Sequence, residues 1–193
     1  TVPTMVASVS TMAGTHFGSK VADEIGAHTT PDGTFDQAAT AGLKLISWLT
    51  GNKTTSQADL LTALGALSTA GATAFNAKFP VGAPTTTCGT GPEKASIAGN
   101  AMRWYSFSGT SVKTNGWDVS DALLAYTADY FKGEANDGLV SQCSSHWGNV
   151  IKDNYDWNHL DEINQVLGGI GKSAPDPVAF YVQHANRLKW AFL

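Results

Sequence analysis

The feature that most constrains this chain is an alternation of short apolar runs with segments of helical periodicity. An apolar run at 5–12 opens the sequence, and a glycine-punctuated loop separates it from a helix-like segment at 20–27. Apolar residues recur at helical spacing over 38–49 and 58–75, and an aromatic run bounded by glycines at 102–107 is typical of a strand. This alternation predicts an α/β fold, with helices covering both faces of the sheet.

The rest of the chain continues the same pattern. Helical segments are predicted at 121–130, 158–167 and 176–188, whereas 80–99 is a polar stretch rich in proline, glycine and threonine. Neither an internal repeat nor a linker interrupts the pattern, and 193 residues suffice for one domain with a hydrophobic core. We therefore expect a single domain over 1–193.

Composition narrows the classes of partner. The net charge is −4 and no run of lysine or arginine occurs, which argues against nucleic acid. The sequence holds no stretch of about 18 apolar residues that would span a membrane. A charged content of only 15%, with many small residues, is common among secreted bacterial enzymes.

The two cysteines, Cys88 and Cys143, can form one disulfide or remain two unrelated buried thiols. Neither lies in a Cys-x-x-Cys or zinc-type spacing, which argues against metal binding through sulfur. A disulfide between them would place the protein in an oxidising compartment. The residues alone leave both arrangements open.

Asp137 is the first candidate for a chemical role. It precedes Gly138 and an apolar pair, a pattern that is typical of a turn within a loop. Taken by itself, this pattern favours an aspartate that caps its own turn.

His159 is the second candidate, because it stands beside carboxylates at the start of a helix-like segment. Histidine is the side chain best suited to proton transfer near neutral pH. The alternative is a helix-capping cluster, in which Asn158 or Asp161 satisfies free backbone amides. Asp161 and Gln165 are four residues apart and would share one helix face, where oxygen ligands would suit a hard cation such as Ca²⁺.

His16 is a third candidate, since it lies in the glycine loop after the first predicted strand, where α/β sheets commonly place their sites. In contrast, no Gly-x-Ser-x-Gly pentapeptide occurs in the chain. The usual nucleophile elbow of a serine hydrolase is therefore not among these residues. A phosphate-binding loop and a dinucleotide fingerprint are also missing from the sequence.

Four blocks of sequence, taken in order, carry a resemblance to a known family. They are MVASV at 5–9 with HFGS at 16–19, LGALSTAG at 64–71 with AFNAKFP at 74–80, ANDGLVSQCSS at 135–145, and WNHLDEINQ at 157–165 with HANRLK at 184–189. Together they resemble the foldase-dependent, calcium-binding true lipases that Gram-negative bacteria secrete. The resemblance covers nearly the whole chain, and the third and fourth blocks are its most specific part.

The resemblance implies the C-terminal portion of an α/β-hydrolase fold, with the later parallel strands, the lid helices and the triad loops. Asp137 and His159 match the acid and the base of a Ser-His-Asp triad. The serine is then expected in an N-terminal part that this chain does not contain. Cys88 and Cys143 match the single disulfide of the family.

A calcium site is implied by the same resemblance. Its ligands match Asp118, Asp161, and carbonyl oxygens at Gln165 and Gly169. Asp121 is the alternative to Asp118, because both lie in the same WDVSD segment. The calcium ion would hold the histidine loop against the acid loop rather than react.

The implied substrate is a triacylglycerol or another ester at an oil–water interface. The segment 36–50 falls where the family carries its lid, with an ordinary core helix as the alternative reading of the pattern. The family reaches the outside of the cell through the periplasm, with help from a dedicated, membrane-anchored foldase. Two other functions stay open: a non-catalytic calcium- or lipid-binding module derived from a lipase, and an esterase of short soluble esters.

The sequence departs from the family in its glycine loop, which reads AGTHFG at 13–18 where the family usually has GAPHKG. His16 and Gly18 nevertheless stay in step with the family pattern. The presence of both Asp137 and His159 argues against the non-catalytic module, because a protein that no longer catalyses the reaction has no need of that pair.

Overall fold

The structure, a computed structural model, describes residues 2–28, 57–165 and 167–191. Its strands and α-helices are, in chain order, β1 (Ser8–Met12), α1 (Lys20–Ala27), α3 (Gln57–Leu67), α4 (Thr69–Lys78), β2 (Lys94–Ile97), β3 (Asn100–Gly109), α5 (Val119–Ala128), β4 (Asn149–Tyr155) and α6 (Pro177–Trp190). The segment 36–50, expected as a lid, lies outside the described residues. None of the described helices is both long enough and apolar enough to cross a membrane.

Strand β3 is the centre of a four-stranded sheet. β1 runs parallel to it, in a register from Ser8 opposite Arg103 to Met12 opposite Phe107. The first part of β3 pairs with β2 in antiparallel fashion, and its later part pairs with β4 in parallel fashion. The predicted α/β fold with a parallel sheet is thus confirmed.

Strand β2 is an element that the sequence analysis placed in a loop. It joins β3 through a tight hairpin in which Ala98 and Gly99 have φ angles of 51° and 81°. Positive φ at both central residues matches the right-handed twist of the two strands, so the short hairpin is stable. Sequence reasoning missed it because alanine at the first turn position is not a hairpin signal.

The helix predicted over 58–75 is divided in two. Ser68 begins α4 as its N-cap, with its hydroxyl oxygen accepting a hydrogen bond from Gly71 N at 3.0 Å. A serine at this position satisfies an amide that the helix itself leaves free, which favours a new helix start over continuation of α3. The apolar periodicity correctly predicted that these residues are helical, but it gives no sign of such a break.

The prediction of a helix over 158–167 is wrong. Only a 3₁₀ turn forms, at Asp161–Ile163, because Asn164 and Leu167 adopt left-handed conformations with φ of 59° and 55°. The shared helix face that was expected for Asp161 and Gln165 therefore does not exist.

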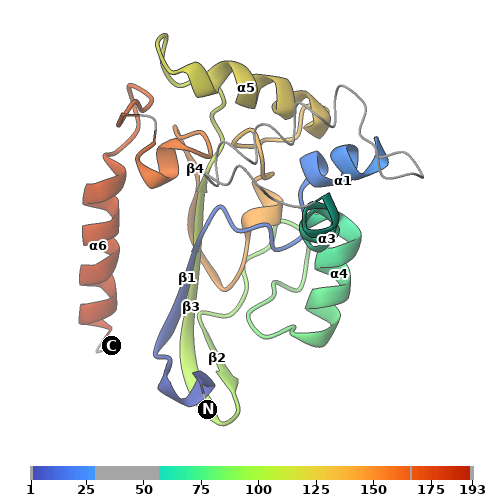
Figure 1. The fold of residues 1–193 in the computed structure, drawn as a ribbon. Coiled ribbons are helices and arrows are strands. Elements are labelled where there is room, and N and C mark those ends of the chain that lie inside the picture. Colours follow the sequence, from blue (N-terminus) through green and yellow to red (C-terminus); the bar gives the residue numbers. More distant parts are fainter. Residues whose placement is uncertain (1, 29–56, 166, 192–193) are drawn as a thin grey trace.

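The helices pack on both sides of the sheet (Figure 1). α6 covers one side, while α1, α3 and α4 gather on the other, and α5 lies across the end where β1 and β3 finish. This end of a parallel sheet is where α/β proteins commonly place their sites.

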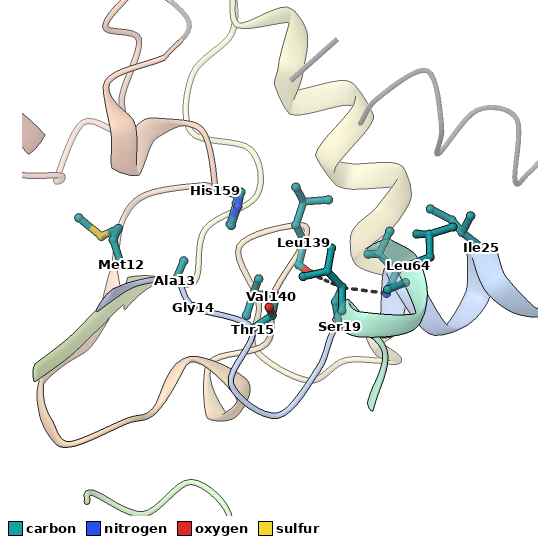
Figure 2. A pocket seen from close by; sticks show the side chains of 13 residues that line it. Met12, Ala13, Gly14, Thr15, Ser19, Ile25, Leu64, Leu139, Val140 and His159 are labelled. Carbon is teal, nitrogen blue, oxygen red and sulfur yellow. Dashed lines mark hydrogen bonds between the residues drawn. The ribbon is translucent and has the colours of Figure 1, made fainter. Parts of the chain in front are cut away.

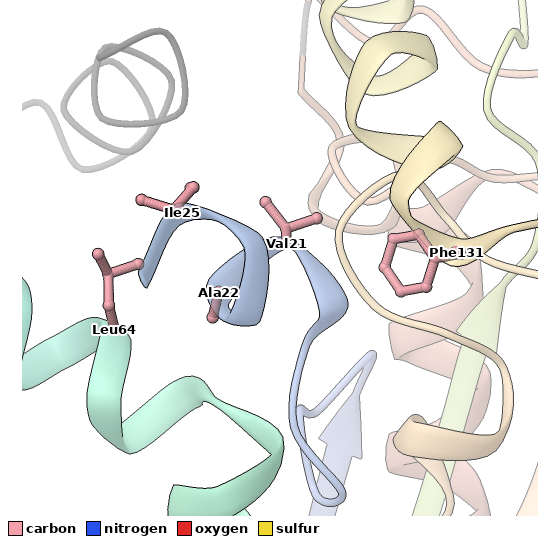
Figure 3. Close-up of a cluster of buried hydrophobic side chains, with 5 residues drawn as sticks. All are labelled: Val21, Ala22, Ile25, Leu64 and Phe131. Carbon is pink, nitrogen blue, oxygen red and sulfur yellow. The ribbon is translucent and has the colours of Figure 1, made fainter. Parts of the chain in front are cut away.

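Three apolar clusters hold these layers together. The first lies between α1 and α3 and consists of Val21, Ala22, Ile25, Leu64 and Phe131 (Figure 3). The second groups Met102, Trp104 and Trp147. The third groups Phe107, Trp157 and Phe180, which ties α6 to β3. The aromatic run predicted as a strand thus contributes side chains to two of the clusters, as a strand with both faces covered does.

Cys88 and Cys143 are joined in a disulfide across a sequence separation of 55 residues. The bond ties the stretch before β2 to the segment that follows Asp137. The pairing implied by the resemblance is present in the structure.

Candidate active site

The Asp137 loop is held by its own side chain. One carboxylate oxygen, Oδ1, accepts hydrogen bonds from the backbone N–H groups of Leu139 and Val140, at 2.9 and 2.7 Å. Gly138 has a φ of 98°, a conformation that favours glycine. The expectation that Asp137 caps its own turn is therefore correct, and the second carboxylate oxygen is left for another partner.

That partner is His159. Its Nδ1 lies 2.8 Å from Oδ2 of Asp137, and its backbone N–H donates to the carbonyl oxygen of Asp137 at 2.9 Å. The side chain of Asp137 is only 1% exposed, whereas that of His159 is 27% exposed. A buried carboxylate thus orients an imidazole whose ring reaches the surface of the site, as a triad base requires.

The electrostatics of this pair favour a charged imidazole. Burial lowers the pKa of His159, but the charge and hydrogen bond of Asp137 outweigh it and raise the pKa to about 9. Asp137 therefore stabilises the imidazolium that forms when His159 takes a proton.

Glu162 is a third ionisable group at this place, and sequence reasoning did not single it out. Its Oε1 accepts a hydrogen bond from Gly109 N at 2.6 Å, and the side chain is buried. Burial raises the pKa of Glu162 well above its usual value, and the negative charge of Asp137 raises it further. The only available signal was its position, three residues after His159.

Asp137, His159 and Glu162 each offer a ligand atom within 4.8 Å of the others, so this group could hold a metal ion. An imidazole in the set would suit zinc more than calcium, which prefers oxygen ligands. Hydrogen bonds already engage His159 Nδ1, Asp137 Oδ2 and Glu162 Oε1. These hydrogen bonds favour proton transfer over metal coordination at this position.

Two other carboxylates present free oxygens. Oδ1 of Asp118 accepts hydrogen bonds from the N–H and hydroxyl of Ser120, at 2.7 and 2.6 Å, and Oδ2 of Asp161 accepts one from Asn158 N at 3.1 Å. Their other oxygens, Asp118 Oδ2 and Asp161 Oδ1, are buried without a hydrogen-bond partner among the described residues. Burial raises the pKa of Asp161 to about 7, and the charges of Asp118 and Asp121 add to this rise. Buried, unpaired carboxylate oxygens near other negative charges fit a cation.

The carboxylate of Asp121 differs from these two because it is fully engaged. Its Oδ2 accepts hydrogen bonds from Thr114 N and Asn115 N, at 2.9 and 3.0 Å. Its Oδ1 accepts one from the side-chain amide of Asn158 at 2.9 Å. Asp121 thus has the role of a buried hydrogen-bond acceptor.

The remaining residues of the predicted calcium site lie on the irregular segment after His159. Gln165 is exposed and its N–H donates to Leu160 O at 2.9 Å. Gly169 is buried beside Asn115 and Trp117, where a side chain would meet Trp117 at 2.7 Å. Their participation in a metal site stays a prediction.

An apolar cavity of about 360 Å³ adjoins His159 (Figure 2). Its walls come from α1, α3 and the Asp137 loop, and include Val21, Ile25, Leu64, Leu67, Leu139 and Val140. Figure 2 shows the imidazole at one side of this cavity and the apolar side chains around the rest. The helical spacing of these apolar residues predicted the helices that carry several of them, but not that their side chains meet beside His159.

His16, the third candidate, is not brought to this cavity. Its Nε2 lies 3.0 Å from the hydroxyl of Thr11, and its ring stacks on Trp147 with centroids 4.9 Å apart. Burial lowers the pKa of His16 to about 4, so the ring is neutral at pH 7. Within the described residues it serves packing rather than proton transfer at the Asp137–His159 pair.

Comparison with known proteins shows what this chain is similar to. The chain is 44% identical to a triacylglycerol lipase of Vibrio cholerae serotype O1, over 99% of this chain and 61% of that lipase. It is 37% identical to one of Pseudarthrobacter phenanthrenivorans and 35% to one of Pseudomonas fragi, covering 67% of each. A mature lipase of Bacillus licheniformis, BlEst2, superposes with a TM-score of 0.47 and 16% identity, over 80% of this chain and 48% of that one. No family model matches the chain.

A mostly parallel sheet covered by helices on both sides, with the Asp137 and His159 loops at one end, defines part of an α/β hydrolase. The chain belongs to the family of bacterial triacylglycerol lipases. It spans about 61% of the length of the V. cholerae lipase.

Proposed function

We propose that this chain is the C-terminal part of a secreted, calcium-stabilised triacylglycerol lipase. Asp137 and His159 act as the acid and the base of its Ser-His-Asp triad, and the serine comes from an N-terminal part outside these residues. The observation that carries the proposal is the 2.8 Å contact between His159 Nδ1 and a buried Asp137 oxygen, beside an apolar cavity. Residues 1–193 are the C-terminal part of a single domain in this proposal, and 36–50, which lies outside the described residues, is proposed as its lid.

The proposed chemistry is acyl transfer to serine and then to water. His159 Nε2 takes the hydroxyl proton as serine attacks the ester carbonyl, and it then gives that proton to the departing alcohol. A water molecule attacks the acyl-enzyme in the same way, with His159 again as base. In the neutral form of His159, which prevails above its pKa of about 9, Asp137 keeps the single proton on Nδ1 and so leaves Nε2 free to accept. Asp137 also stabilises the imidazolium formed in each half of the reaction.

Calcium is proposed to bind between the segment before α5 and the histidine loop. The buried unpaired oxygens of Asp118 and Asp161 support these two residues as ligands, together with carbonyl oxygens at Gln165 and Gly169. The ion would supply positive charge that joins the two segments, so its role is to hold His159 in place. The full engagement of Asp121 favours Asp118 over Asp121 as the ligand.

The apolar cavity supports an ester with a fatty acyl chain as substrate, bound at an oil–water interface. The Cys88–Cys143 disulfide supports passage through an oxidising compartment, in line with export through the periplasm. Assistance by a lipase-specific foldase belongs to the same proposal and rests on the sequence resemblance.

The test uses this chain joined to the region of the V. cholerae lipase that it does not cover, hereafter the completed lipase. We expect the completed lipase to release fatty acid from a triacylglycerol emulsion, whereas the 193-residue chain alone does not. His159→Ala should lower kcat by about 10⁶-fold and Asp137→Asn by about 10⁴-fold, as loss of the triad base and of the triad acid does.

Three results separate the alternatives. Activity that survives His159→Ala refutes the triad assignment. Activity on short soluble esters without activity on the emulsion identifies an esterase. A folded completed lipase that binds calcium but hydrolyses neither substrate is a non-catalytic binding module.

A further inference from the structure

A buried hydrogen-bond network joins the start of α5 to the histidine loop. Its centre is the carboxylate of Asp121, which is 6% exposed. Oδ2 of this carboxylate accepts from the backbone N–H groups of Thr114 and Asn115, and Oδ1 accepts from Asn158 Nδ2 at 2.9 Å. The hydroxyl of Thr114 adds a longer contact to Oδ1 at 3.4 Å. Asp121 therefore bridges two segments of backbone.

Asn158, the residue directly before His159, is completely buried and has its side-chain amide fixed in one orientation. Its Oδ1 accepts hydrogen bonds from Leu160 N and Asp161 N, at 2.8 and 2.9 Å. The amide nitrogen must then face an acceptor, because a buried donor without a partner is costly. Asp121 Oδ1 is that acceptor at 2.9 Å, and the Thr114 hydroxyl oxygen, which itself contacts Asp121 Oδ1, is a longer second one at 3.5 Å.

The consequence for His159 follows from its place in the loop. The side chain of Asn158 holds the backbone that follows His159, through its hydrogen bonds with Leu160 N and Asp161 N. The N–H of His159 itself donates to Asp137 O. The histidine backbone is thus held between the acid loop and an amide whose orientation depends on Asp121.

We propose that Asp121 is a positioning residue for His159 that acts through Asn158. This proposal rests on the proposed function of His159 as the triad base. Asp121 touches neither the imidazole nor the apolar cavity among the described residues. Its effect is to keep the Asn158 amide oriented, and thereby to keep the imidazole aligned with Asp137.

The pairing predicts that exchanging the two side chains preserves the network. In the double variant Asp121→Asn with Asn158→Asp, the new amide oxygen at 121 accepts from Thr114 N and Asn115 N. The new amide nitrogen donates to the carboxylate at 158, whose second oxygen still accepts from the N–H groups of 160 and 161. Each single variant breaks the pair: Asp121→Asn opposes two donors, and Asn158→Asp opposes two carboxylates.

Two measurements follow these variants. The first is the proton NMR signal of His159 Nδ1–H in the 193-residue chain, which reports the hydrogen bond to Asp137 without any need for catalysis. The second is kcat and KM of the completed lipase, measured well below the melting temperature of each variant. Asp118→Asn, on the same segment, is the comparison variant for calcium binding: it should abolish binding of the ion, whereas Asp121→Asn should retain it.

We expect Asp121→Asn to weaken or remove the His159 signal and to lower kcat by up to about 100-fold, with KM unchanged, because small displacements of a catalytic group have effects of this size. Calcium should still bind this variant with one ion per chain. The exchanged double variant should recover the signal and most of the lost kcat.

Wild-type kcat and an unchanged His159 signal in Asp121→Asn would overturn the proposal, and so would a folded double variant without recovery. If the double variant does not fold, Asp121→Ala decides. Asp121→Ala removes the acceptors of Thr114 N and Asn115 N as well as the contact with Asn158. If Asp121 mainly holds the 114–115 backbone, kcat of Asp121→Ala is much lower than that of Asp121→Asn. If only the contact with Asn158 matters, the two variants have equal kcat. An inactive completed wild type refutes the proposed function, while the NMR arm still tests the positioning.

Discussion

The partly buried histidine His16 should make the protein sensitive to acid, and one substitution at this position should remove that sensitivity. Its ring stacks on Trp147 and contacts the hydroxyl of Thr11, and burial lowers its pKa from 6.5 to about 4. In the unfolded chain the same side chain binds a proton near pH 6.5. Between these two values the unfolded state binds more protons, so stability falls as the pH is lowered.

The size of the effect follows from the two pKa values. The stabilisation is complete above pH 6.5 and is lost as the pH falls toward about 4. Over that range the loss amounts to about 3 kcal/mol, at about 1.4 kcal/mol for each pH unit. His16→Phe keeps an aromatic ring against Trp147 but cannot titrate, and it gives up the contact with Thr11, which costs about 1 kcal/mol.

The order of stability of wild type and His16→Phe should therefore reverse between pH 7 and pH 4. At pH 7 the His16→Phe variant should be about 1 kcal/mol less stable than wild type, and at pH 4 about 2 kcal/mol more stable. Urea unfolding at pH 7, 5.5 and 4 gives both free energies of unfolding, and acid effects from other groups cancel in their difference. A difference between variant and wild type that stays constant from pH 7 to 4 would refute the assignment of a partly buried, neutral His16.

Three further predictions concern the site and its support. Asp161→Ala should lower the melting temperature strongly in calcium and little in chelator; an equal change in both solutions rules out this ligand. Replacing Cys88 and Cys143 together by serine should cost about 4 kcal/mol in urea unfolding, because the bond closes a 55-residue loop; a cost near zero contradicts the entropic account. Gly138→Ala should lower both stability and kcat of the completed lipase, since its φ is 98° and the new methyl would meet Leu124 at 2.7 Å; wild-type kcat would show a tolerant acid loop.

The fold was predictable from the sequence where a periodic apolar pattern decides structure. β1 and the aromatic strand β3 lie where short apolar and aromatic runs predicted them, although β1 begins at Ser8 because a 3₁₀ turn occupies Val2–Met5. Helix ends were less predictable, because they depend on single polar contacts such as the Ser68 cap. The irregular segment after Asp161–Ile163 was missed for the same reason: two non-glycine residues adopt left-handed conformations there, which no local propensity indicates.

The site was predictable in its residue types and only partly in its arrangement. Asp137 and His159 were candidates from their short motifs, and the resemblance to the lipase family implied their roles; the structure brings them into contact. The partners of Asp121 could not be foreseen, since its bond to Asn158 joins residues 37 positions apart. The choice between Asp118 and Asp121 depends on which backbone amides face each carboxylate, and that is a property of the folded turn.

Capping and the proposed catalysis are not competing roles at these two loops, although the sequence patterns present them as alternatives. A loop that carries a functional side chain leaves backbone amides without helix or sheet partners, and these must be satisfied when they are buried. Asp137 does this with one oxygen and offers the other to His159. Asn158 does it with its amide oxygen and passes the orientation of its nitrogen to Asp121. A capping signature beside a histidine is therefore what a rigid catalytic loop requires, because a base held by mobile backbone would lose the alignment on which proton transfer depends.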